Sequence, residues 1–197
     1  DTPEDYDEIV VPQGTEDTYN TYYGHHAGLD SPTDKRYNSF FGAYAGANND
    51  GTNNCIYGYM AGHENRGSSN CIVGSGAGAE NRGSRNILIG NSTGYNCWGD
   101  YNTLIGYVVG WETFEADGNT IIGGQAGKNL NGGDNNTIIG RLAGTENTYG
   151  NYNVFLGYGS GGNNETGSSN ICIGTWSGFN LNNQSNRLYI GGPAPLI

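Results

Sequence analysis

Pairs of adjacent apolar residues recur along the chain at a nearly constant interval, and a glycine follows each pair. The full unit is Asn, one variable residue, two apolar residues, Gly, two variable residues, a small residue and Gly, as in Asn136–Gly144. Copies this closely and regularly spaced are typical of stacked repeat architectures. The first glycine of the unit is separated from the next by 18 residues once, by 16 four times and by 17 five times, at Gly24, Gly42, Gly58, Gly74, Gly90, Gly106, Gly123, Gly140, Gly157, Gly174 and Gly191.

The two apolar positions of each repeat form two columns, and a single coil can bury only one of them. Adjacent residues of a strand point to opposite faces of its sheet. One column runs from Tyr22 to Tyr189 and the other from Tyr23 to Ile190. The outward column must be covered by a second sheet or another subunit, because so long an apolar stripe is too large to leave in water. The sequence therefore predicts that the chain is not a stable monomer.

An asparagine stands four residues before each of the first ten of these glycines, and Arg187 takes its place in the last repeat. Stacked one coil above the next, these side chains are expected to form a ladder of amide hydrogen bonds. We interpret the ladder as structural rather than as a ligand site. Its members are Asn20, Asn38, Asn54, Asn70, Asn86, Asn102, Asn119, Asn136, Asn153 and Asn170.

Small residues and further glycines complete the unit. The small residue that precedes the second glycine, as in Ala143-Gly144, predicts a thin interior, and the paired glycines predict sharp corners. A third glycine, such as Gly133, marks a second corner before most of the asparagines. We therefore predict an all-β protein, a β-solenoid or β-roll of about eleven two-stranded coils of 16–17 residues.

The repeat divides the chain into a solenoid domain over residues 20–191, an arm over residues 1–19 and a short tail over residues 192–197. Seven of the first seventeen residues are acidic, and they surround Ile9, Val10 and Val11. One interpretation of the arm is a solvated tail. The other is a strand that pairs with an edge of the solenoid, in its own molecule or in a neighbour.

Composition narrows the class of partner. The chain has 197 residues, of which 36 are glycines. Its formal net charge of −11 argues against nucleic acid and anionic membranes as partners. No apolar run has the length of a membrane span. Cys55 and Cys71 occupy equivalent positions in adjacent coils, within reach of a disulfide. A stack of two free thiols fits that spacing equally well.

The sequence contains only weak matches to catalytic and ligand-binding motifs. The segments Gly90–Gly94 and Gly157–Gly162 imitate a nucleophile elbow and a dinucleotide loop, but their glycines belong to the repeat. We expect no catalytic residue, no cofactor and no metal, with a structural calcium ion at corner aspartates as the alternative. Aromatic residues at corners form a candidate recognition surface: Tyr95, Trp98, Trp111 and Trp176.

The unit Asn-x-h-h-Gly-x-x-Ala-Gly, where h is apolar, resembles the YadA-like head repeats of trimeric autotransporter adhesins and the related repeats of phage tail fibres. The resemblance covers Asn20 to Gly191. It implies a left-handed β-roll that associates side by side as a homotrimer. The family repeat is shorter than this one, and its stalk and membrane anchor have no counterpart here.

These observations predict a non-enzymatic rod that self-associates outside the cell, at a cell surface or in a virion fibre, as an adhesin head or fibre segment. Its expected partners are copies of itself and a surface glycan or a host or matrix protein. Two alternatives remain open, an extracellular filament joined head to tail by the arm and an ice-binding protein. The column after each asparagine is too mixed for a threonine array, which weakens the ice-binding alternative.

Overall fold

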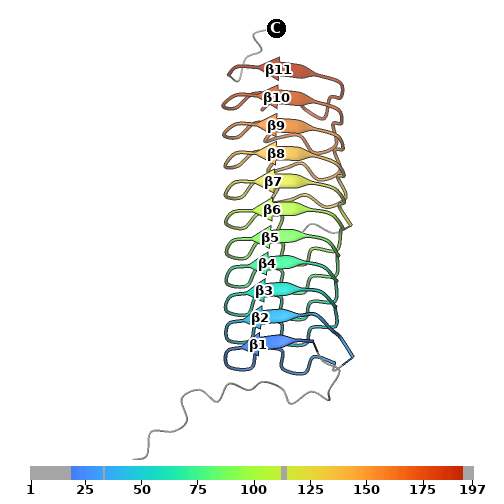
Figure 1. The fold of residues 1–197 in the computed structure, drawn as a ribbon. Coiled ribbons are helices and arrows are strands. Elements are labelled where there is room, and N and C mark those ends of the chain that lie inside the picture. Colours follow the sequence, from blue (N-terminus) through green and yellow to red (C-terminus); the bar gives the residue numbers. More distant parts are fainter. Residues whose placement is uncertain (1–18, 33, 112–114, 193–197) are drawn as a thin grey trace, which may run out of the picture.

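The computed structural model describes residues 19–32, 34–111 and 115–192. These residues form eleven strands of three residues each and no helix (Figure 1). The strands are β1 (Thr21–Tyr23), β2 (Ser39–Phe41), β3 (Cys55–Tyr57), β4 (Cys71–Val73), β5 (Ile87–Ile89), β6 (Thr103–Ile105), β7 (Thr120–Ile122), β8 (Thr137–Ile139), β9 (Val154–Leu156), β10 (Ile171–Ile173) and β11 (Leu188–Ile190).

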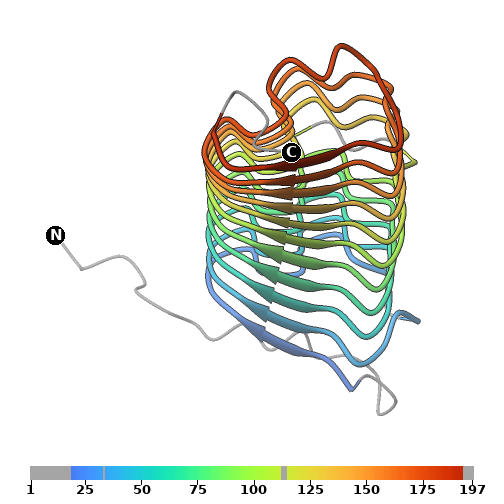
Figure 2. The ribbon, with the colours of Figure 1, turned by 90° about the horizontal axis from the view of Figure 1, so that it is seen from above.

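All eleven strands belong to one parallel sheet, in which strands that are consecutive in the sequence pair with each other. The register places equivalent repeat positions side by side, as in Ile121 beside Ile138. The chain therefore rises by one coil per repeat, and the strands of successive coils lie side by side along the stack (Figure 2). The predicted β-solenoid is confirmed, while the hand of the coil stays a prediction.

Each described coil contributes one strand, so the prediction of two strands per coil is wrong. The other side of the coil is a run of turns. Residues with positive φ alternate there with residues of ordinary φ, as at Met60 (φ 51°) and Gly62 (φ 56°), so this backbone is not extended. It still bonds from coil to coil, since Gly62 N–H donates to Ala77 O over 2.8 Å.

The core is built of columns of stacked side chains that run along the solenoid. The first apolar column of the sequence points inward, and Phe40, Leu88 and Ile138 in it are fully buried. Across from this column lie the small residues of the repeat, such as Ala61 and Ala143, which are also buried. The predicted thin interior is confirmed.

Two positions of the repeat require glycine for two reasons. Their φ angles are positive, and a Cβ there would lie too close to neighbouring atoms. Gly74 has a φ of +133°, and a Cβ there would lie 2.4 Å from Gly90 O in the next coil. A Cβ on Gly62 would lie 2.5 Å from Ile56 Cδ1. The first glycine therefore lets neighbouring coils approach, and the second leaves room for the inward side chain.

We predict that Gly74→Ala lowers the free energy of unfolding by more than about 3 kcal/mol, because the new methyl group meets backbone atoms in a strained conformation. Gly124→Ala is the matched control, since a Cβ at Gly124 meets nothing within 4 Å. That change should be neutral or stabilising by up to about 1 kcal/mol. Urea unfolding of both variants tests the prediction, and equal effects would contradict it.

Candidate functional site

The outer face of the sheet carries a column of apolar residues along the rod. The second apolar column points outward, and its members include Leu156 (43% exposed) and Ile190 (40% exposed). The variable residue after each asparagine lies on the same face, and in the carboxyl-terminal half it is often aliphatic, as at Ile171. Two parallel columns of residues thus form one flat strip along the rod.

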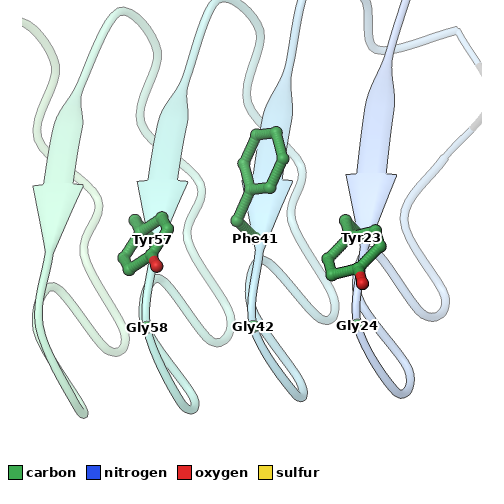
Figure 3. A pocket seen from close by; sticks show the side chains of 6 residues that line it. All are labelled: Tyr23, Gly24, Phe41, Gly42, Tyr57 and Gly58. Atoms are coloured by element: carbon green, nitrogen blue, oxygen red, sulfur yellow. The ribbon is translucent and has the colours of Figure 1, made fainter.

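The amino-terminal end of this strip carries an aromatic groove of about 440 Å³, lined by Tyr23, Phe41 and Tyr57 with Gly24, Gly42 and Gly58. The rings of Tyr23 and Tyr57 lie at the turn that ends their strands, whereas the Phe41 ring points back along β2 (Figure 3). Centroids of neighbouring rings lie 6.4 Å and 6.3 Å apart. The space between the two tyrosines is therefore open above the bare backbone at Gly42.

The predicted asparagine ladder is present, and from Asn38 to Asn170 its members are buried. The expected amide-to-amide bonds occur at two steps, where Asn119 donates to Asn102 Oδ1 over 3.2 Å and Asn136 donates to Asn119 Oδ1 over 3.1 Å. Most other bonds of the ladder are to backbone groups. The side-chain oxygen of Asn54 accepts from Asn70 N–H over 2.9 Å, and its amide donates to Gly67 O over 3.0 Å. Most side chains of the ladder therefore satisfy backbone groups of the next coil. The ladder ends at Arg187, which replaces the asparagine in the last repeat. The backbone N–H of Arg187 donates to Asn170 Oδ1 over 3.0 Å, so this last bond does not require an asparagine side chain at position 187.

A second buried ladder was missed by the sequence analysis. Asn65 donates to Asn49 Oδ1 over 2.7 Å, and Asn81 donates to Asn65 Oδ1 over 2.6 Å. Farther along the rod, Asn164 donates to Asn147 over 2.8 Å. The signal was an asparagine seven residues after the first glycine of some repeats, which the interruptions at other copies obscured.

The second ladder stops where the next coil lacks an amide. Cys97 stands one coil after Asn81, and Leu181 stands one coil after Asn164. The two buried oxygens at these ends, Asn81 Oδ1 and Asn164 Oδ1, have no hydrogen-bond partner. An unsatisfied buried acceptor destabilises the folded state.

The corner aspartates considered for calcium form a column of their own. The carboxylate of Asp117 accepts from Asp100 N–H over 2.7 Å, and that of Asp134 accepts from Asp117 N–H over 2.8 Å. Serine and asparagine continue the column, for example at Ser84 and Asn151. These side chains thus act as acceptors for backbone groups, and the described residues contain no group of three or more potential metal ligands.

Of the four aromatic residues proposed for recognition, only Tyr95 and Trp111 come together. Tyr95 and Trp111 stack at 5.0 Å, and the Tyr95 hydroxyl donates to Glu80 over 2.6 Å, which raises the Tyr95 pKa. Trp98 lies under the Arg82 guanidinium at 4.3 Å. Trp176 packs against Tyr158 and Phe179, several coils away. The strand proposed at Ile9, Val10 and Val11 lies outside the described residues.

None of the four cysteines, all of which lie among the described residues, forms a disulfide. Cys55 and Cys71 are register partners on β3 and β4, and burial, followed by repulsion from the Cys55 thiolate, raises the pKa of Cys71. Cys172 lies in the inward column, where burial raises its pKa to about 12. Cys97 is also buried in the core.

The fold and the two ladders define the chain as a β-solenoid repeat protein. No protein-family model, curated protein or solved structure matches this chain. Within the described residues, no helix reaches the length and hydrophobicity that a membrane span requires.

We predict that Cys97→Asn raises the free energy of unfolding by about 1 kcal/mol, because the new amide donates to Asn81 Oδ1. The melting temperature should rise by about 2–4 °C. Cys172→Asn is the control, because it buries an amide among apolar side chains and should destabilise the fold. Differential scanning calorimetry of both variants tests the ladder, and equal losses in both would contradict it.

Proposed function

We propose that this chain is a non-enzymatic structural rod that associates with copies of itself through the outer face of its sheet. The observation that carries the proposal is the outward apolar column, which runs from Tyr23 to Ile190 with no covering element among the described residues. Side-by-side association of three copies is the arrangement that the resemblance to trimeric adhesin heads favours. Such a rod would serve as an adhesin head or fibre segment outside the cell, with a surface glycan or a host or matrix protein as its target.

The size of the face supports association. Strands about 4.8 Å apart give a strip about 50 Å long, and three residues at about 3.3 Å each make it about 10 Å wide. The strip therefore offers on the order of 500 Å² per copy, and two such faces approach the roughly 1,000 Å² of a specific interface. A patch of this size is at the upper end of what monomers expose.

We predict that Ile122→Asp with Ile139→Asp converts the assembly to a folded monomer, because two carboxylates would be desolvated in the interface. The same double change at the buried neighbours Ile121 and Ile138 should unfold the rod instead. Light scattering gives the mass of each variant, and circular dichroism shows whether it is folded.

A matched control adds the same charge away from the sheet. Thr175→Asp with Asn180→Asp alters two exposed turn residues and should leave the oligomeric state unchanged. The proposal is wrong if the unmodified chain is a well-folded monomer at all concentrations studied.

Head-to-tail assembly into a filament is the second candidate. In the described part of the chain, β1 and β11 each pair on one side only, so both ends of the sheet present backbone groups to a further strand. The arm before Asn20 would supply that strand, through Ile9, Val10 and Val11.

We predict that removing residues 1–19 changes the behaviour of the rod. Loss of a cap from its own molecule exposes an edge and should cause aggregation, whereas loss of a linker should shorten fibres to soluble rods. Electron microscopy and melting curves distinguish these outcomes. An unchanged assembly state and melting temperature would show that the arm is only a tail.

A further inference from the structure

One coil near the carboxyl-terminal end lacks side chains at two positions where its neighbours carry them. Gly159 and Gly162 lie in the segment Gly157–Gly162, whose glycines imitate a dinucleotide loop in sequence. Backbone hydrogen bonds fix the alignment, since Glu146 N–H donates to Gly162 O over 3.0 Å and Gly159 N–H donates to Arg141 O over 3.0 Å. The two affected columns read Leu142, Gly159, Trp176 and Thr145, Gly162, Phe179.

The missing side chain at Gly162 leaves a notch beside the next coil, whereas the Trp176 ring occupies the space at Gly159. A Cβ on Gly159 would lie 2.4 Å from Trp176 Cε3, and a Cβ on Gly162 would lie 3.1 Å from the Phe179 ring. The two rings of the following coil thus lean over the bare backbone. A cavity of about 220 Å³ remains, bounded by these rings, by Leu142 and Thr145 of the preceding coil, and by Glu146 and Asn163.

The apolar part of the notch is a corner made of two aromatic rings. The planes of Trp176 and Phe179 meet at 88°, with centroids 4.9 Å apart. Two perpendicular rings can surround a rounded group from two sides, and the negative potential above an aromatic face attracts a cation. The protein already uses this attraction nearby, where the Arg141 guanidinium lies 5.7 Å from the centroid of the Tyr158 ring.

The polar part of the notch carries a negative charge. Glu146 is exposed, and its Oε2 accepts from the Asn129 amide over 3.0 Å, which orients the carboxylate. Among the described residues, neither of the two ion pairs involves Glu146. The whole chain carries a formal charge of −11. Both the local and the overall charge favour a cationic ligand and oppose an anionic one.

We propose that this notch binds an organic cation of the quaternary or alkylated ammonium class. The alkyl groups lie against Trp176 and Phe179, and the charge faces Glu146. Such a cation occurs free in solution and also in the headgroup of a lipid, and the chemistry of recognition is the same. None of the lining residues belongs to a strand, so the site goes beyond the proposed self-association and does not depend on it.

Choline chloride is the first probe, used with the full chain in ligand-observed NMR and in calorimetric titration. We expect a dissociation constant on the order of 1 mM, as befits a ligand of few atoms. The uncharged carbon analogue, 3,3-dimethyl-1-butanol, has the same shape and should bind at least about tenfold more weakly, since it has no cation–π attraction.

Three substitutions locate the site. Trp176→Ala should weaken choline binding by about tenfold. Glu146→Gln should weaken it by about threefold at low salt and by less at high salt, because the carboxylate is screened. Trp111→Ala is the matched control, since it removes a ring from the column of Phe179 at a coil without the notch, and it should leave binding unchanged. Circular dichroism checks that each variant is folded.

Several outcomes would overturn the proposal. The proposal is wrong if the folded chain does not bind choline, if the carbon analogue binds as tightly as choline, or if Trp176→Ala and Trp111→Ala weaken choline binding equally. Binding of methyl β-D-galactoside in the absence of choline binding would assign the notch to carbohydrate instead. Cosedimentation with phosphatidylcholine vesicles, compared with binding of free choline, shows which source of the cation the site reaches.

The test is separable from the test of self-association. The variant that carries Ile122→Asp and Ile139→Asp should bind choline as the unmodified chain does, whatever its oligomeric state. If the unmodified chain assembles but does not bind choline, the notch proposal alone is wrong, and if the unmodified chain is a folded monomer that binds choline, the interface proposal alone is wrong.

Discussion

The rod depends on the satisfaction of buried polar groups of one coil by the coil beside it. The oxygen of each ladder asparagine accepts a backbone N–H of the next coil, as Asn70 does from Asn86 over 2.8 Å. Its amide donates to a corner carbonyl, Gly83 O in this case, over 2.9 Å. A coil separated from its neighbours would therefore bury unsatisfied donors and acceptors. This requirement makes the repeat cooperative, and it explains why the asparagine hardly varies while the surrounding residues do.

The same close stacking restricts the residues that can stand at the corners. Coils about 4.8 Å apart leave no space for a side chain that points along the rod axis. The corner glycines satisfy this restriction, since a Cβ on Gly67 would overlap Gly83 O. Where a repeat departs from its neighbours, the departure leaves a local feature. The missing amide after Asn81 leaves an unpaired oxygen, and the bare backbone at Gly162 leaves a notch.

The outer face follows from the geometry of so short a strand. With three residues per strand, only the middle one points inward, and both flanking residues point outward. The inward column of the strands is opposed mostly by alanine and serine, which gives the coil a thin core. The core has no room for the other apolar residues of each strand, which therefore lie on the surface. We propose that a second copy of the chain covers them.

The repeat unit by itself determined the period, the parallel stacking and the principal ladder, because equivalent residues must meet when identical coils are stacked. Tertiary structure decided which apolar column is buried, since Ile121 and Ile122 are alike in chemistry and differ only in the direction of their side chains. It also decided that each coil has one strand, because alternating positive φ angles at residues such as Met60 replace the second strand with turns. Neither the second ladder nor the notch could be predicted from the sequence. Both depend on which residue of one coil lies against which residue of the next, and that alignment is fixed only when the coils pack.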